Sequence, residues 1–225
     1  LSTGDELVSP EQEVTPGKIR DINTYSLSAL ALQAGAIPLP SGLVGDSYDA
    51  LREAAEREME RADMLVISAG SSVSTRDLTA QVISSLGEPG VLVHGVSIRP
   101  GKPTILASVG GKPAIGLPGN PVSALVIFDL FVVPTIYRLA GCSSPPTRPT
   151  VEARLTHNLA SVTGREDYVP VRLETTPEGL SAVPIFGESN LISTMMRADG
   201  MALVPLDRSG ISAGEMVTVR LFQGV

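Results

Sequence analysis

Four segments of the chain combine Gly, Ser and Pro with charged or hydroxyl side chains, and each follows an apolar run. They are residues 2–7 (STGDEL), 68–77 (SAGSSVSTRD), 99–103 (RPGKP) and 117–123 (LPGNPVS). Ligands of open α/β sheets gather at the carboxyl ends of the strands. Backbone N–H groups in such loops, with a helix N-terminus behind them, suit phosphate or another oxyanion. The sequence therefore predicts an oxyanion site formed by these four loops at one sheet edge.

The RPGKP segment carries two cations on a stiff backbone. Pro100 and Pro103 restrict the chain and Gly101 permits a sharp bend, so we expect Arg99 and Lys102 to emerge close together. A rigid loop with two adjacent cations suits a tetrahedral dianion. Two solvated surface charges are the alternative interpretation of the same residues.

The LPGNPVS segment opens a long helix, with Pro121 at its first position after Asn120. The Ser123 hydroxyl and the free N–H groups of the first turn are candidate anion donors. A turn followed by a well-capped helix, without any ligand, is the plainer interpretation.

Two carboxylates, Glu6 and Asp77, fall in two of the four segments. Beside phosphate-binding loops they could coordinate Mg²⁺ through oxygen and water, although each could also be an exposed loop acid or a helix cap. His94 and His157 lie far apart, with no Cys or second His at metal-ligand spacing. The sequence therefore predicts no transition-metal site from them.

Alternating strands and helices precede residue 142. We expect Asn23 and Asp46 to cap the first two helices, and Pro134 to kink the last one. The helices are expected at 24–34, 48–62, 78–86 and 121–140, and the strands at 64–68, 91–98, 104–109 and 113–117. Gly110-Gly111 should form a hairpin turn. This order predicts an α/β domain with a mainly parallel sheet.

The pattern changes after a linker at residues 142–148. Residues 149–225 contain short strands separated by turns and almost no helical periodicity, which predicts a small β domain. At the other end, LSTGDEL is typical of a strand running into a loop. We therefore expect this strand to begin earlier, in a longer protein.

Composition and charge exclude several classes of protein. The hydrophobic content is 43% and the net charge is -7. There are 10 basic and 15 acidic residues before Gly141, and 7 basic and 9 acidic residues after it, so neither half has the basic excess of a nucleic-acid binder. The single Cys142 fits a reducing, cytoplasmic compartment. We find no signal peptide and no apolar run of membrane-spanning length, so no membrane association is expected.

The motifs resemble, in order and over essentially the whole chain, those of the MoeA and gephyrin E-domain family. Besides STGDEL, the loop ending in Asp77 and PGKP, they are GLPGNPVSALVIF (116–128), GREDYVPVRL (164–173) and GESNLISTMMRADGMALVP (187–205). The resemblance implies a MogA-like three-layer α/β domain over residues 1–141 and a β-barrel-like domain over 149–225. One loop departs from the family's GGVSVG-x-x-DY, with Ala69, Ser71, Ser74 and Leu78 at changed positions.

The resemblance also implies a reaction in molybdenum cofactor biosynthesis. A molybdopterin molybdenumtransferase binds adenylylated molybdopterin with Mg²⁺, takes up molybdate and releases AMP. The implied catalytic residues are Glu6, Asp77 and Lys102, of which Glu6 and Asp77 would hold the metal. The implied substrate-binding residues are Gly70, Ser72, Arg99, Pro103, Asn120, Ser123, Arg165 and Ser189. Of these, Arg99, Lys102, Arg165 and Ser189 would bind molybdate.

Partners and alternatives follow from the same resemblance. It implies a homodimer and a possible association with the molybdopterin adenylyltransferase. The segment TRDLT also resembles a loop of that adenylyltransferase family, so a MogA-like adenylyltransferase is a second interpretation. A non-catalytic pterin-binding or scaffold protein is a third, and the altered loop would fit it.

Overall fold

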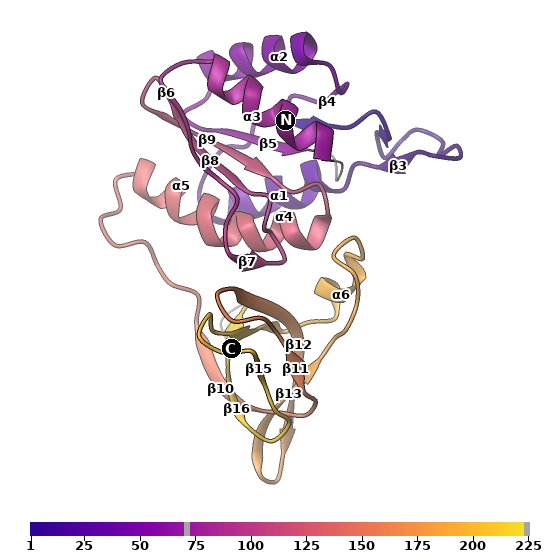
Figure 1. The fold of residues 1–225 in the computed structure, drawn as a ribbon, viewed down its shortest axis with the longest axis vertical. Helices are drawn as coiled ribbons and strands as arrows, with labels where there is room; N and C mark the ends of the chain where they lie inside the picture. The colour runs from indigo at the N-terminus through magenta and orange to yellow at the C-terminus, as the bar shows by residue number, and fades with distance from the viewer. Residues whose placement is uncertain (70–72, 223–225) are drawn as a thin grey trace. The chain divides into compact units, whose positions relative to one another are not determined.

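The computed structural model describes residues 1–69 and 73–222, together with the side chains of these residues except 73–76. The chain forms two compact units (Figure 1). The first comprises residues 1–96 and 103–145, and the second comprises residues 97–102 and 146–225. The sequence placed residues 97–102 in the α/β domain, whereas in the structure they belong with the β unit.

A six-stranded sheet forms the centre of the first unit. Five of its strands run in the same direction, and β8 alone is antiparallel to its two neighbours, β9 and β6. The strand order is β4 (Leu43–Val44), β1 (Ser2–Thr3), β5 (Leu65–Ala69), β9 (Lys112–Leu117), β8 (Ile105–Val109) and β6 (Pro89–His94). A separate parallel pair is formed by β2 (Leu7–Val8) and β3 (Ile19–Arg20). The expected mainly parallel sheet is therefore confirmed.

Helices cover both faces of this sheet and make the unit three-layered (Figure 1). One face carries α2 (Tyr48–Arg61) and α3 (Val73–Ser85). The other carries α1 (Asn23–Gln33) and the helix that begins at Pro121. The core is aliphatic, with fully buried side chains such as Leu51, Ile67 and Ile83. Aliphatic side chains therefore fill this core, and few aromatic residues are needed for a sheet buried on both faces.

The long helix contains a π-helical turn in place of a simple kink. It consists of α4 (Pro121–Ile127), the π segment η1 (Phe128–Val132) and α5 (Val133–Leu139). Pro134 has no N–H and its ring displaces the preceding turn, so the helix widens just before it. The Thr135 hydroxyl donates to the Phe131 carbonyl at 2.7 Å, which satisfies one of the displaced acceptors.

Within the described residues, one helix is long and apolar enough to cross a membrane by length and composition alone. It spans Pro121–Leu139 with a mean hydropathy of 1.8, and 44% of it is buried inside the unit. The expectation that no apolar segment reaches this length was therefore wrong. Phe128 and Val132 of this helix belong to the protein interior, which accounts for its apolar character.

Several helix ends differ from the sequence prediction. In the first helix Ile22 occupies the N-cap position and Asn23 is already helical, and the Oδ1 of the preceding Asp21 accepts the Thr24 N–H at 3.1 Å. Asp46 does not cap the second helix, because Ser47 occupies the cap position. The third helix was expected near Leu78 and begins at Val73.

The expected single strand over 91–98 is interrupted. Strand β6 ends at His94, and Gly95 adopts a φ of +97°, a conformation that favours glycine. The next strand, β7 (Ile98–Arg99), pairs in parallel with Glu166 and Asp167 of the second unit. The chain therefore passes from the first unit to the second within residues 91–98, although their sequence pattern predicts a single strand.

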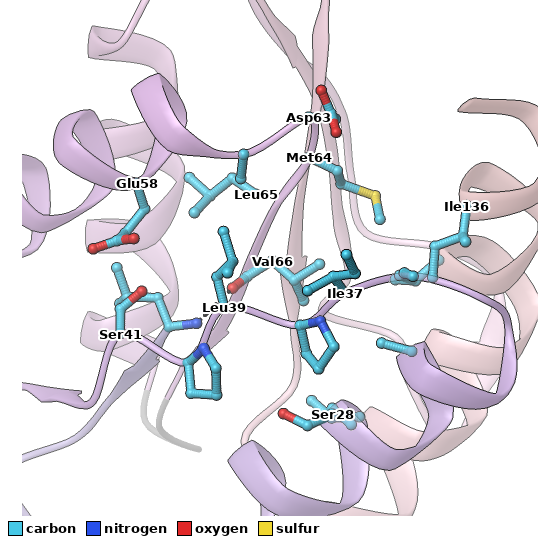
Figure 2. Close-up of a pocket in the computed structure, with 18 of the residues that line it drawn as sticks. Ser28, Ile37, Leu39, Ser41, Glu58, Asp63, Met64, Leu65, Val66 and Ile136 are labelled. Carbon is cyan, nitrogen blue, oxygen red and sulfur yellow. Dashed lines mark hydrogen bonds between the residues drawn. The ribbon is translucent and has the colours of Figure 1, made fainter. Parts of the chain in front are cut away.

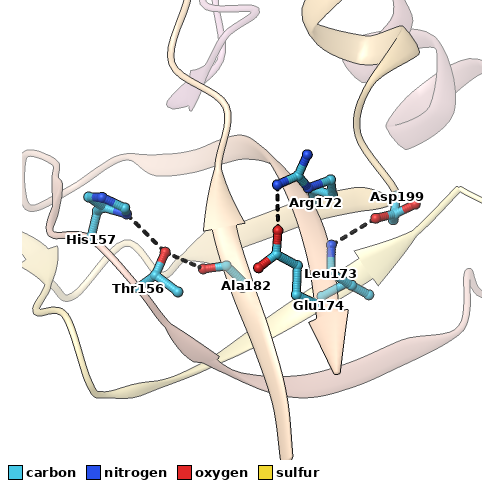
Figure 3. Close-up of polar contacts among 7 residues, drawn as sticks. All are labelled: Thr156, His157, Arg172, Leu173, Glu174, Ala182 and Asp199. Carbon is cyan, nitrogen blue, oxygen red and sulfur yellow. Dashed lines mark hydrogen bonds and ion pairs between the residues drawn. The ribbon is translucent and has the colours of Figure 1, made fainter. Parts of the chain in front are cut away.

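The second unit is a closed five-stranded barrel, as expected. Its strands are β12 (Glu166–Thr176), β13 (Gly179–Pro184), β10 (Thr150–Leu155), β16 (Met216–Leu221) and β14 (Gly200–Val204), and β12 pairs with both β13 and β14 to close the ring. The shorter elements are β11 (Leu159–Ala160), β15 (Gly210–Ile211) and α6 (Ser193–Met196). Surface contacts on β12 include the Arg172–Glu174 ion pair and the Leu173 N–H bond to Asp199 Oδ2 at 2.7 Å (Figure 3).

Gly200 lies on β14, close to the backbone of the neighbouring strand β16. A Cβ at this position would come within 2.5 Å of the Arg220 carbonyl oxygen and 2.9 Å of a Val219 methyl group. We expect Gly200→Ala to destabilise the barrel by roughly 1–3 kcal/mol, because backbone strands must move apart to admit the methyl group. Urea unfolding monitored by circular dichroism measures this change. An unaltered unfolding midpoint would contradict the expected clash.

Candidate functional site

The carboxyl ends of four neighbouring parallel strands bring several loops to one edge of the first unit. Residues 4–6 follow β1, residues 45–46 follow β4, and residues 118–120 follow β9. The segment after β5 also starts there, but Gly70 and Ser72 lie outside the described residues, as does the changed position Ser71. Three of the four predicted loops therefore begin at this edge. The fourth, RPGKP, follows β7 and is divided between the units, with residues up to Lys102 in the second unit and Pro103 in the first.

Glu6 is held against the turn that follows β1. The Leu7 N–H donates to the Gly4 carbonyl at 3.0 Å, and the Ile19 N–H donates to the Glu6 carbonyl at 2.9 Å. A Cβ on Gly4 would lie 2.9 Å from Glu6 Oε2. Glycine at position 4 therefore leaves the space that the half-buried Glu6 carboxylate uses.

Asp5 joins two of the loops at this edge. Its Oδ1 accepts the Asp46 N–H at 3.1 Å, and its carbonyl accepts from Lys18 Nζ at 2.6 Å. The Thr3 hydroxyl donates to Asp46 Oδ1 at 2.8 Å. These bonds give Asp5 and Asp46 structural roles, which leaves Glu6 as the carboxylate of this turn suited to a ligand.

A buried amide links the loop after β9 to the sheet. Asn23 is 7% exposed, and its Nδ2 donates to Ser68 Oγ at 2.7 Å and to the Gly119 carbonyl at 2.9 Å. The sequence missed this role because Asn before an apolar helix is typical of a cap. The only sequence signal for this role was that two polar residues, Asp21 and Asn23, lie at the start of one helix.

The other predicted residues of this edge differ in exposure. Ser123 is buried in the first turn of α4, and Asn120 is half-buried in the loop before it. Asp77 is exposed and lies within α3, so it was wrongly assigned to the preceding loop. Pro103 is half-buried and precedes β8.

A second group of predicted residues meets in the β unit. Arg99 lies on β7 and Arg165 directly precedes β12, and both contact the carboxylate of Asp167. Arg165 donates from Nε to Oδ1 at 2.6 Å and from Nη2 to Oδ2 at 3.0 Å, and Arg99 Nη1 is 3.6 Å from Oδ2. The hydrogen bonds that Arg165 donates to the Asp167 carboxylate raise the pKa of the Arg165 guanidinium.

We refer to Arg99, Lys102 and Arg165 as the cation cluster. Lys102 is exposed three residues after Arg99, on the same segment of the second unit. Three cations and the single carboxylate of Asp167 give this group a formal charge of +2. Ser189, in the loop before α6, belongs to the same unit and is half-buried. The four residues expected to bind molybdate are therefore all in the β unit, whereas the sequence placed two of them in the α/β domain.

The first unit also contains a cleft of about 750 Å³. It lies between α1, the segment around Ile37 and Leu39, strand β5 and the side chain of Ile136 (Figure 2). Its lining is mainly apolar, with Glu58 and Asp63 at its margin. None of the described candidate site residues lines it, although Ser2 and Ser68, at the start of two of the loops considered above, do.

The carboxylates suit a magnesium ion held only partly by protein. Among the described residues, no three His, Cys, Asp or Glu side chains gather closely enough to hold a metal. Mg²⁺ is usually bound by one or two carboxylates, with substrate phosphates and water completing its shell. Glu6, which lies beside Gly4, and the exposed Asp77 are the two carboxylates that the sequence suggested for this role.

Comparison with known families assigns both units. Residues 1–138 match the probable molybdopterin binding domain, and residues 152–222 match the MoeA C-terminal region, domain IV. The chain belongs to the molybdopterin-binding domain family. Within it, the chain combines this domain with the C-terminal region of MoeA proteins.

Individual relatives agree with this assignment. The chain is 38% identical to a molybdopterin molybdenumtransferase from Nostoc sp., over 97% of this chain and 51% of the relative. It is 32% identical to a molybdopterin molybdenumtransferase from Haemophilus influenzae, over 99% and 55% respectively. A solved molybdopterin biosynthesis MoeA protein from Pyrococcus horikosii superposes with a TM-score of 0.85 and 40% identity, covering 100% of this chain and 54% of that one. The chain thus spans about half the length of these relatives.

Proposed function

We propose that the complete protein is a molybdopterin molybdenumtransferase, which inserts molybdate into adenylylated molybdopterin and releases AMP. The observation that carries this proposal is the cation cluster. Arg99 and Arg165 are distant in sequence, yet both contact Asp167, and Lys102 lies on the same segment as Arg99. Two arginines on one carboxylate, with a further cation on the segment of one of them, suit a tetrahedral oxyanion such as molybdate.

The loops at the carboxyl edge of the first unit would bind the nucleotide half of the substrate. Asn120 and Ser123 stand at the start of a long helix, where backbone N–H groups and the helix dipole favour phosphate. The bonds from Asn23 to Ser68 and Gly119 hold the loop after β9 against the sheet. A fixed loop loses little conformational freedom when phosphate binds.

Glu6 and Asp77 would hold Mg²⁺ against the phosphates of the adenylylated pterin. When bound, the metal would offset the charge that develops as the phosphoanhydride is cleaved. Glu6 contributes a carboxylate fixed by the turn around Gly4, and Asp77 contributes one from α3. Lys102 and Arg99 would orient molybdate, with Arg165 and Ser189 completing its binding groups.

Two alternatives predict different reactions. A MogA-like adenylyltransferase would transfer AMP from ATP to molybdopterin, and the match of residues 152–222 to the MoeA C-terminal region counts against it. A non-catalytic pterin-binding or scaffold protein would bind the pterin and release no AMP. The changed positions Ala69, Ser74 and Leu78 are the sequence feature that favours this alternative.

The proposed function also predicts an oligomeric state and a partner. We expect a homodimer in the cytoplasm that receives its adenylylated substrate from a molybdopterin adenylyltransferase. Sedimentation of the complete protein tests the dimer, and a strictly monomeric species at high concentration would contradict it.

The reaction is tested with the complete protein, adenylylated molybdopterin, molybdate and Mg²⁺. We expect AMP release that requires both molybdate and Mg²⁺, with formation of a product that activates an apo-molybdoenzyme. Incubation with ATP and molybdopterin should yield no adenylylated pterin. Adenylylation in the second assay would support the adenylyltransferase, and pterin binding without AMP release in the first would support the scaffold.

A further inference from the structure

Asp167 occupies an unusual position for a carboxylate of the β unit. It lies on β12, opposite Arg99 of β7 on one side and Val204 of β14 on the other, and it is 3% exposed. Buried carboxylates are rare unless they are paired. Its backbone is fixed by strands on both sides, so its side chain offers two arginines a rigid acceptor.

The contact with Arg165 fixes the direction of the guanidinium. A guanidinium carries five N–H donors in one plane, and Asp167 receives one from Nε and one from Nη2. Because two parallel bonds define the plane and the rotation of the group, the remaining donors point in a set direction. Arg99 Nη1 is 3.6 Å from the same carboxylate, which is an ion pair beyond hydrogen-bond distance, so one acid orients Arg165 and also attracts Arg99.

Removing the Asp167 charge would have two opposing effects on an anion. The formal charge of the group would rise from +2 to +3, which attracts an anion more strongly. The Arg165 guanidinium would also lose one of the two acceptor oxygens that orient it, because an amide keeps only one. The Arg99 side chain is 63% exposed and that of Arg165 is 29% exposed, so solvent and salt screen the change in charge. The loss of orientation is not screened and should therefore dominate.

We infer that Asp167 is a positioning residue of the oxyanion site, which aligns Arg165 and keeps Arg99 beside it so that their remaining N–H groups meet a tetrahedral dianion. This inference rests on the proposed function, because molybdate is the dianion in question. It predicts that anion binding weakens when a negative charge is removed next to the anion. A purely electrostatic role predicts the opposite.

The test measures molybdate binding by isothermal titration calorimetry with the complete protein. Asp167→Asn removes the charge with little change of size, and Asp167→Glu keeps the charge but moves the carboxylate by one methylene group. We expect both variants to weaken molybdate binding by about tenfold or more, because oriented charge-assisted bonds are lost. Glu174→Gln is the matched control, since it removes an exposed acid that pairs with Arg172 on the same strand (Figure 3). It should bind molybdate like the wild type.

Each outcome decides the inference. Tighter binding by Asp167→Asn, or wild-type binding by Asp167→Glu, would overturn it in favour of a simple charge effect. If Glu174→Gln weakened molybdate binding equally, the effect would not be specific to Asp167, and the inference would be overturned. Circular dichroism establishes that each variant is folded, and AMP binding to the first unit should stay unchanged, which a general loss of structure would not allow. If Asp167→Asn does not fold, Asp167→Glu alone decides. Failure of the wild type to bind molybdate would instead refute the proposed function.

Discussion

Glu6→Gln is expected to lower molybdate-dependent AMP release by about a hundredfold or more, because it removes a proposed Mg²⁺ ligand without changing the size of the side chain. The Glu6 carboxylate is the one held against Gly4, while the carboxylates of Asp5 and Asp46 are occupied by bonds between the β1 and β4 loops. An amide offers the metal a neutral oxygen in place of a charged one. The measurement is the rate of AMP release as a function of Mg²⁺ concentration.

The dependence of the rate on Mg²⁺ concentration distinguishes a metal ligand from a carboxylate with only a structural role. The Mg²⁺ concentration for half-maximal rate should rise in Glu6→Gln, and excess Mg²⁺ should restore part of the activity. Glu13→Gln is the matched control, since Glu13 is an exposed acid of the neighbouring loop. If Glu6→Gln and Glu13→Gln both retain the wild-type rate and Mg²⁺ dependence, Glu6 is not a metal ligand.

Local sequence patterns were sufficient for much of the fold. The Gly110-Gly111 turn, with φ of +56° and +83°, joins β8 and β9 as expected, because both positions favour glycine. The short strands after residue 149 were also expected from the pattern, whereas the barrel that they form was implied by the family resemblance. In the turn and in the individual strands, neighbouring residues determine the structure, so the pattern contains the information.

The errors come from contacts between distant residues. The apolar run from Val91 to Ile98 appeared to be one strand, but its last residues pair with Glu166 and Asp167, about seventy positions away. The importance of Asp167 was hidden for the same reason, since an acid near basic residues is usually a solvated surface charge. Its burial results from strands on both sides, and no local pattern in the sequence reports this.

The last prediction concerns Lys102, which lies on the segment shared by Gly101 and Pro103. Gly101 is buried with a φ of +129°, so the backbone that carries Lys102 is held in a conformation that favours glycine. Little freedom then remains to be lost when an anion binds. A charge-assisted hydrogen bond contributes roughly 1.5–3 kcal/mol, so its loss should weaken molybdate binding by about ten- to a hundredfold.

We therefore expect Lys102→Ala in the complete protein to impair cofactor formation at low molybdate concentration, with partial rescue by excess molybdate. Binding of the adenylylated pterin should change much less, because the proposed nucleotide loops lie in the first unit, at the carboxyl ends of its parallel strands. Arg172→Ala is the matched control, as it removes one exposed cation of the same unit outside the cation cluster. The measurement is a titration of molybdate against cofactor formation for the wild type and both variants. Superimposable curves for the wild type and Lys102→Ala would mean that Lys102 is a solvated surface charge, and that Arg99 and Arg165 bind the anion without it.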